Sequence, residues 1–179
     1  MSNAETALLG LLAERPMHPY QIEKEVENRD MRFWADLSMS SIYKLLRKLE
    51  TGGFVSSSTK LSDENRARKT YELTAEGIEL LRDRVRVYLS EPELTKSRMD
   101  VAISNLAVIP SSEAVDCLQS YKSALMERRN GYQALEGFLK HEGCPGYRLA
   151  FARRPIHIIE GEMRWVDDYV NELLVQDNE

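Results

Sequence analysis

The sequence predicts a mainly α-helical protein with one small two-stranded sheet, divided into residues 1–92 and residues 93–179. Apolar side chains recur at intervals of three and four along most of the 179 residues, which is the period of amphipathic helices. Residues 54–73 are the exception, because two strand-like segments, FVSSSTKL and ARKTYEL, flank the polar stretch SDENR. Charge also separates the two parts: residues 1–90 carry 14 basic and 14 acidic side chains, whereas residues 91–179 carry 10 and 15.

Two helices are expected at the start of the N-terminal part. The first spans about residues 5–14, and the second spans about residues 19–30 and begins at Pro19, which suits a first helical turn. The stripes expected to face the core are Ala7, Leu8, Leu11 and Leu12 in the first helix and Tyr20, Ile22 and Val26 in the second. Residues 31–37 are expected to form a loop anchored by Trp34.

A third helix is predicted over residues 39–51, with Ser38 or Ser40 as its cap and a double glycine at its end. Its buried stripe consists of Ile42, Leu45, Leu46 and Leu49. The strand pair of residues 54–73 follows, and Thr74 caps a fourth helix. Three helices, a hairpin and a fourth helix form the order of a winged helix-turn-helix, a fold that commonly holds duplex DNA.

The C-terminal part is predicted to be a helical domain. A short amphipathic helix over residues 98–108 precedes a long helix over residues 112–141, in which apolar positions alternate in steps of four and three. A Gly-Cys-Pro-Gly turn at 143–146 leads to the last helix, which Pro155 either starts or kinks. Two long helices joined by a tight turn predict an antiparallel hairpin, which we expect to mediate dimerisation.

Three segments together resemble the PadR family of transcriptional regulators, in its subgroup with a virulence-activator-type helical C-terminal domain. They are HPYQIEKEVENR, SSIYKLLRKLETGGFV and KTYELTAEG, which contain the patterns I-Y-x-x-L-x-x-L-E-x-x-G-x-V and Y-x-L-T-x-x-G. The resemblance implies a homodimer that binds operator DNA and is often released by a small ligand. The sequence departs from the family pattern at His18, where glycine is common, and at Pro155, which interrupts a stretch usually helical throughout.

Ten side chains are candidates for contact with DNA. Residues 38–70 carry seven basic and three acidic groups, a local excess that favours phosphate contact although the whole chain has a net charge of −5. The candidates are Ser40, Ser41, Tyr43, Lys44, Arg47 and Lys48 on the third helix, and Lys60, Arg66, Arg68 and Lys69 on the hairpin. Arg47 is the best suited to bidentate reading of guanine, whereas the lysines suit phosphates. The alternative is that these residues are only the solvated face of an amphipathic helix.

A homodimer is expected to form through the last helix, with residues 156–175 packed against the partner. The residues that carry this expectation are Ile159, Met163, Trp165, Val166, Tyr169, Val170 and Leu173. Trp and Tyr on a helix surface are common interface anchors. The alternative is a monomer whose tail folds wholly on itself.

Several classes of protein are excluded by composition and motifs. There is no run of 18 apolar residues and no secretory signal, so we expect a cytoplasmic protein without a membrane partner. Cys117 and Cys144 form no CxxC pair and the three histidines are scattered, so no metal or cofactor is expected. Two chance SxxK matches lack the partner motifs of β-lactamases, and no nucleotide fingerprint occurs, so the protein is not expected to be an enzyme.

The function expected from these observations is sequence-specific regulation of transcription. A two-fold dimer would place two recognition helices ~34 Å apart and would bind a near-palindromic operator, most simply as a repressor. A small phenolic or aromatic effector is a further expectation, in a cavity between the fourth helix and the C-terminal part that is lined by some of Trp34, Tyr88, Met99, Tyr121 and Tyr132. The alternative function is a winged-helix scaffold for protein–protein interaction, because a fold does not determine a function.

Overall fold

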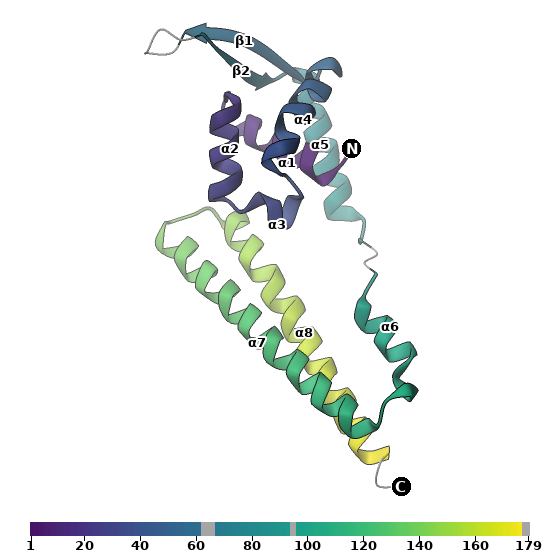
Figure 1. Ribbon diagram of the computed structural model, residues 1–179. Helices are drawn as coiled ribbons and strands as arrows, with labels where there is room; N and C mark the ends of the chain where they lie inside the picture. The colour runs from purple at the N-terminus through teal and green to yellow at the C-terminus, as the bar shows by residue number, and fades with distance from the viewer. Residues whose placement is uncertain (62–66, 94–95, 177–179) are drawn as a thin grey trace. The chain divides into compact units, whose positions relative to one another are not determined.

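The computed structural model describes residues 1–61, 67–93 and 96–176 and divides into two compact units, Met1–Leu94 and Thr95–Glu179. The first unit contains α1 (Asn3–Glu14), α2 (Pro19–Asn28), α3 (Met31–Ala35), α4 (Met39–Thr51), β1 (Val55–Leu61), β2 (Ala67–Leu73) and α5 (Ala75–Ser90). The second contains α6 (Arg98–Ser104), the 3-10 turn η1 (Leu106–Val108), α7 (Ser111–His141) and α8 (Gly146–Gln176). The predicted fold class, mainly α with a two-stranded wing, is confirmed (Figure 1).

The core of the first unit is built from the inner faces of its helices and the base of the wing. Its fully buried side chains include Leu8, Leu9, Met17, Ile22, Ile42 and Leu46. The strands β1 and β2 pair antiparallel from Val55–Leu73 to Leu61–Ala67, and Met17 adds an isolated bridge to Tyr71. This register anchors the wing to the segment between α1 and α2, so the base of the hairpin is rigidly attached to the helices.

Hydrogen bonds at the helix ends explain why several helices begin where they do. Ser2 and Glu5 form a reciprocal capping box at the start of α1, with Ser2 N donating to the Glu5 carboxylate at 2.7 Å. Thr74 caps α5 as predicted, because its hydroxyl accepts from Gly77 N at 3.0 Å. Gly53 adopts φ +77° between α4 and β1, in the left-handed region that favours glycine.

Four local predictions for the first unit are corrected by the structure. Residues 31–35 form the short helix α3 rather than a loop, and its anchors are Met31 and Ala35, since Trp34 is 42% exposed. Tyr20, expected in the core, is 58% exposed. Ser38 occupies the N-cap of α4 but makes no side-chain capping hydrogen bond. Leu45 is only half-buried, although it packs against the core.

The second unit consists of the α7–α8 hairpin with α6 and η1 beside it. The two long helices run antiparallel (Figure 1). A core of Ala114, Leu118, Val166, Val170 and Leu173 lies between them. The predicted helix over residues 98–108 ends earlier, at Ser104, and continues as the 3-10 turn. Pro155 lies inside α8, so this helix starts at Gly146 and includes the proline. Within the described residues, no helix is both long and apolar enough to cross a bilayer.

Candidate nucleic-acid interface

The two faces of α4 differ sharply in burial. Ile42 and Leu46 are 0% exposed and Leu49 is 3% exposed, so these three side chains hold the helix against the core of the unit. Tyr43 is 57% exposed on the other side, where Lys44 and Arg47 are exposed as well. The spacing of the buried residues therefore determines which side chains the helix presents to solvent, as the sequence predicted.

The N-terminus of α4 carries a cluster of three serines. The Ser38 hydroxyl lies 3.1 Å from that of Ser40 and donates to that of Ser41 at 3.2 Å. Ser41 in turn donates to the Ser38 carbonyl at 2.7 Å. The Ser41 hydroxyl is therefore already engaged within the cluster, whereas the exposed Ser40 side chain lies at its edge.

Lys48, a candidate DNA contact, is the counterion of a buried carboxylate. Its ammonium lies 2.5 Å from Oε1 of Glu5 in α1, whose side chain is only 4% exposed. Burial tends to raise the pKa of Glu5, but hydrogen bonds from Lys48 and Ser2 and the nearby positive charges outweigh it and lower the pKa overall. The Lys48 side chain is itself 69% exposed. The ion pair thus ties the start of α1 to the C-terminal half of α4.

Lys69 on the wing is paired in the same way. Its ammonium lies 2.9 Å from Oε2 of Glu50 and 4.9 Å from the centre of the Tyr71 ring. The other oxygen of Glu50 accepts a hydrogen bond from the Ser57 hydroxyl. The hydrogen bonds from Ser57 and Lys69 lower the pKa of Glu50, and the bond to Glu50 raises the pKa of Lys69. Glu50 therefore connects the last turn of α4 to both strands of the wing.

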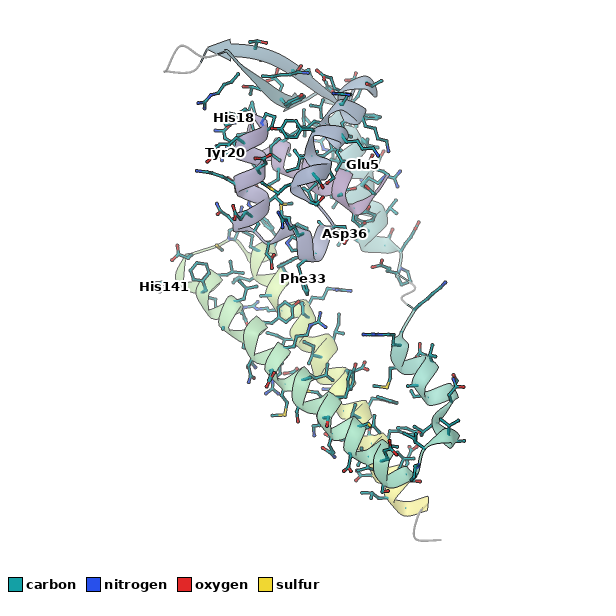
Figure 2. All side chains as sticks on the ribbon, in the orientation of Figure 1. Glu5, His18, Tyr20, Phe33, Asp36 and His141 are labelled. Atoms are coloured by element: carbon teal, nitrogen blue, oxygen red, sulfur yellow. The ribbon has the colours of Figure 1, made fainter. Side chains whose placement is uncertain are left out.

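Arg68 approaches α2 rather than α4. Its Nη1 lies 3.5 Å from Nε2 of His18, the residue that caps α2. Figure 2 labels His18 and Tyr20 on α2. The rings of His18 and Tyr20 stack with centroids 6.3 Å apart, and Lys24 Nζ lies 4.9 Å from the Tyr20 centroid. The sequence predicted that a helix begins at Pro19, but it did not indicate that His18 lies beside the wing. No local pattern along the chain shows that β2 passes close to His18.

Two of the predicted wing contacts are only partly placed. Arg66 falls outside the described residues. Lys60 is described as a strand position that pairs with Arg68 across the hairpin. Among the described candidates, α4 presents Ser40, Tyr43, Lys44 and Arg47 to solvent, while Lys48, Arg68 and Lys69 contact Glu5, His18 and Glu50.

Most of the predicted dimerisation residues lie inside the α7–α8 hairpin of the same chain. Ile159, Val166, Val170 and Leu173 are each at most 6% exposed. Met163, Trp165 and Tyr169 are half-buried, and the rings of Trp165 and Tyr169 stack with centroids 5.4 Å apart. Apolar residues in steps of four and three pack equally well against a helix of the same chain or of another chain. The sequence pattern therefore does not distinguish residues of the hairpin core from residues of a dimer interface.

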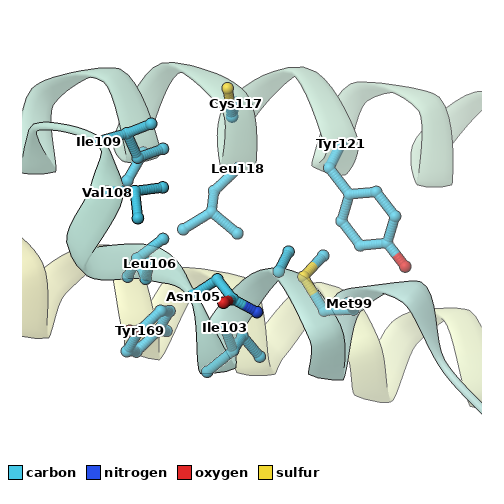
Figure 3. Close-up of a pocket in the computed structure, with 12 residues that line it drawn as sticks. Met99, Ile103, Asn105, Leu106, Val108, Ile109, Cys117, Leu118, Tyr121 and Tyr169 are labelled. Atoms are coloured by element: carbon cyan, nitrogen blue, oxygen red, sulfur yellow. The ribbon is translucent and has the colours of Figure 1, made fainter.

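An apolar cavity of about 350 Å³ lies in the second unit between α6, η1 and α7, with Tyr169 of α8 on its wall (Figure 3). Met99 and Tyr121, two of the five predicted lining residues, contribute to it. Tyr132 does not line it, and Trp34 and Tyr88 belong to the other unit. Burial and the neighbouring Glu162, whose carboxylate accepts the Tyr121 hydroxyl at 3.2 Å, raise the pKa of Tyr121.

No group of three or more His, Cys, Asp or Glu side chains among the described residues is placed to hold a metal ion. Cys117 and Cys144 are both free thiols.

Residues 8–83, which contain α2, α4 and the wing, match the transcriptional regulator PadR-like family. The chain carries a PadR-like domain. A curated relative, the negative transcriptional regulator PadR of Bacillus subtilis (strain 168), is 28% identical over 131 residues, covering 73% of this chain and 70% of the relative. The family and this relative are transcriptional regulators, not enzymes, in agreement with the expectation from sequence.

Solved structures extend the likeness over both units. The structure of Bacillus subtilis PadR in complex with operator DNA covers 94% of this chain and 98% of that chain, with a TM-score of 0.75 and 20% identity. Its complex with p-coumaric acid covers 96% and 98%, with a TM-score of 0.77 and 19% identity. The Vibrio cholerae virulence activator AphA covers 97% and 99%, with a TM-score of 0.69 and 17% identity. The fold, including the helical tail, is therefore that of PadR-like and AphA-type regulators.

Proposed function

We propose that this PadR-like transcriptional regulator is a repressor that binds a near-palindromic operator as a homodimer in the cytoplasm. The observation that carries the proposal is the exposed polar face of α4, with Tyr43, Lys44 and Arg47 on it, held in place by the fully buried Ile42 and Leu46. Support also comes from the relative, which is described as a negative regulator and whose structure was solved with operator DNA.

Within this proposal the candidate contacts have different roles. Arg47 reads a base edge in the major groove, and Lys44, Tyr43 and the serines of the α4 N-terminus contact nearby phosphates. The wing residues Lys60, Arg66 and Arg68 contact the flanking backbone. Lys48 and Lys69, which the sequence placed in the same set, are engaged by Glu5 and Glu50 and act mainly as tethers of α1 and the wing to α4.

The proposal is tested by footprinting the purified chain on the promoter of its own gene, followed by titration of the protected duplex. Arg47→Ala should cost about 1–3 kcal/mol of binding free energy and should relax the base preference at one position of each half-site. Arg86→Ala is the matched control, because Arg86 is an exposed arginine of the same unit that pairs with Asp83 on α5. Equal binding by the two variants would exclude base reading by Arg47.

Salt dependence separates this function from the alternative, a protein–protein scaffold. A DNA-binding regulator loses affinity steeply as salt rises, because its lysines and arginines release condensed counterions from the phosphates. A scaffold would bind promoter DNA weakly and without a protected site. The absence of any protected segment at low salt would favour the scaffold.

The dimer is proposed to form through α8 and its neighbours. The side chains available for contact are Trp165 and Tyr169, which are half-buried, together with Ile158, Leu174 and Val175, which are 52%, 47% and 62% exposed. Sedimentation at micromolar concentration should give twice the chain mass of 20.6 kDa. A species of 20.6 kDa under these conditions would contradict the dimer.

A small aromatic effector is the last element of the proposal. The complex of the Bacillus subtilis relative with p-coumaric acid and the apolar cavity beside Met99 and Tyr121 support it. Phenolic acids titrated into the protein–DNA complex should release the DNA. A substitution that fills the cavity from the exposed Ala102 of α6, Ala102→Phe, should abolish release while leaving DNA binding intact. Release that persists in this variant would place the effector elsewhere.

A further inference from the structure

The cavity between α6, η1 and α7 offers a ligand an uncharged wall. Met99, Ile103, Leu118 and Tyr169 are among its lining residues, and no Asp, Glu, Lys, Arg or His occurs among the described residues that line it (Figure 3). An engineered apolar cavity of roughly 150 Å³ binds benzene, so a space of about 350 Å³ holds one ring with a short substituent. An ionised group in such a space is costly, because it loses water and gains no partner of opposite charge.

The polar groups on this wall accept hydrogen bonds more readily than they donate them. The Tyr121 hydroxyl donates its proton to Glu162 Oε1 at 3.2 Å, so its lone pairs remain for a ligand. The side-chain amide of Asn105 donates to two oxygens of α6, at 2.8 Å and 3.1 Å, and its carbonyl oxygen can only accept. The thiol of Cys117 is a weak donor. A ligand that satisfies these acceptors must itself donate, as a phenol or alcohol hydroxyl does and a carboxylate does not.

Charges behind the wall also disfavour an anion. Burial first and the charge of Glu162 second raise the pKa of Tyr121, so the negative charge of Glu162 acts on this end of the cavity. The charge of Arg128 acts on Tyr121 in the opposite sense and more weakly. Lys122, the neighbour of Tyr121 in the chain, is already paired with Asp167 at 2.5 Å. A carboxylate in the cavity would therefore lie in the field of Glu162, and no cation of the described wall would compensate it.

We propose that this cavity selects uncharged aromatic molecules that carry a hydroxyl donor, such as esters of phenolic acids, over the phenolic carboxylates themselves. This selectivity deepens the proposed effector role and rests on it. The ligand ring packs among Met99, Leu118 and Tyr169, because thioether and aromatic groups make favourable contacts with a ring. The ligand hydroxyl donates to the oxygen of Tyr121 or Asn105.

Trp165 supplies a local readout of binding, because its ring stacks on Tyr169 of the cavity wall with centroids 5.4 Å apart. The substitution Trp34→Phe leaves Trp165 as the single tryptophan of the chain. Methyl p-coumarate and p-coumaric acid are titrated at neutral pH, where the acid is ionised, with affinity from calorimetry and location from Trp165 fluorescence. We expect both to change the fluorescence and the ester to bind about tenfold more tightly, since it buries no charge.

Two further comparisons separate the effect of charge from that of the hydrogen bond. Methyl p-methoxycinnamate keeps the ring and the ester but has no hydroxyl donor, and it should bind about fivefold more weakly than methyl p-coumarate. Ala102→Lys brings a cation to the wall from the exposed Ala102 of α6, and Ala102→Gln is its uncharged control of similar length. The preference for the ester over the acid should fall about tenfold in Ala102→Lys and should persist in Ala102→Gln.

Each contrary result has a distinct meaning. If p-coumaric acid bound more tightly than its methyl ester, the selectivity would be overturned and the effector role would stand. If neither compound changed the fluorescence of Trp165, both the selectivity and this effector site would be refuted. A fluorescence change that follows protein concentration and no ligand would assign the cavity to a second copy of the chain and overturn the inference. DNA binding is measured separately by footprinting, so a chain that prefers the ester but protects no promoter segment refutes only the regulator.

Discussion

Lys44 and Lys48 lie one turn apart on the same face of α4, yet the structure predicts opposite consequences for their neutralisation. The Lys48 ammonium is 2.5 Å from a Glu5 oxygen, whereas Lys44 has no ion pair among the described residues. Replacing each lysine with glutamine changes charge by one unit and keeps a long polar side chain. The two variants therefore differ mainly in whether the replaced lysine forms an ion pair with an acidic side chain of the same chain.

The magnitudes follow from the burial of Glu5, whose side chain is 4% exposed. Among the described residues, Lys48→Gln leaves this carboxylate with the Ser2 N–H bond of 2.7 Å alone, and the loss should destabilise the protein by about 1–2 kcal/mol. Lys44→Gln should change stability by less than about 0.5 kcal/mol, as exposed substitutions usually do. DNA binding should respond in the opposite way. Lys44→Gln should lower the slope of log K against log salt concentration by about 0.9, and Lys48→Gln should leave this slope unchanged.

Denaturant unfolding and DNA titrations between low and moderate salt measure the two effects separately. The folded pKa of Glu5 is lowered from its ordinary value of 4.5, so its contribution to stability is present above that pH and is lost as the pH falls through the folded pKa. The stability difference between wild type and Lys48→Gln should accordingly shrink below pH 4.5. If Lys48→Gln lowered the salt dependence of DNA binding and left stability unchanged, the Lys48–Glu5 ion pair would not be a tether between α1 and α4.

Three further expectations follow from close contacts elsewhere in the chain. Gly77→Ala would place a Cβ 2.0 Å from the Phe54 carbonyl oxygen and should destabilise the first unit by more than about 2 kcal/mol. Gly137→Ala is the control, because a Cβ there would have nothing within 4 Å, and it should raise the melting temperature. Equal melting temperatures for the two variants would contradict the close approach of Phe54 to Gly77. Glu50→Gln should speed hydrogen exchange of the wing amides, because the link between α4 and both strands is weakened, and unchanged exchange would mean that the strands need no such link. Trp165→Ala should shift the sedimentation equilibrium toward monomer without unfolding the α7–α8 hairpin, and an unchanged equilibrium would remove this residue from the interface.

The outline of the DNA-binding unit could be predicted because it depends on local and periodic signals. The stripe of Ile42, Leu46 and Leu49 indicates which face of α4 is buried, and the structure confirms this. Thr74 caps α5 as predicted, and the glycine of the Y-x-L-T-x-x-G pattern, Gly77, is explained by its contact with Phe54. The stripe and the cap involve residues within a few positions of each other, and glycine and polar residues mark the chain reversal of the wing.

Aromatic positions were the least reliable part of the sequence interpretation. Tyr20 and Trp34 were expected inside and are exposed, because a large amphipathic ring fits either a core or a surface and periodicity alone does not distinguish them. The segment around Trp34 became a helix of five residues, which is too short for a periodic pattern to reveal. Val166 and Val170 of the predicted dimerisation set pack with Ala114 and Leu118 of α7 in the same chain, so the other members of the set carry the prediction of a dimer.

By itself, the sequence determined the order of the elements apart from α3, the exposed face of α4, the two strands of the wing and the family of the N-terminal unit. Only the tertiary structure decided which charges remain available on that surface. Glu5 and Lys48 are 43 positions apart, and His18 and Arg68 are 50 positions apart. Their pairing depends on how α1, α2, α4 and the wing pack, and such long-range contacts leave no local pattern along the chain, because each residue alone is an ordinary charged or polar side chain on its own element.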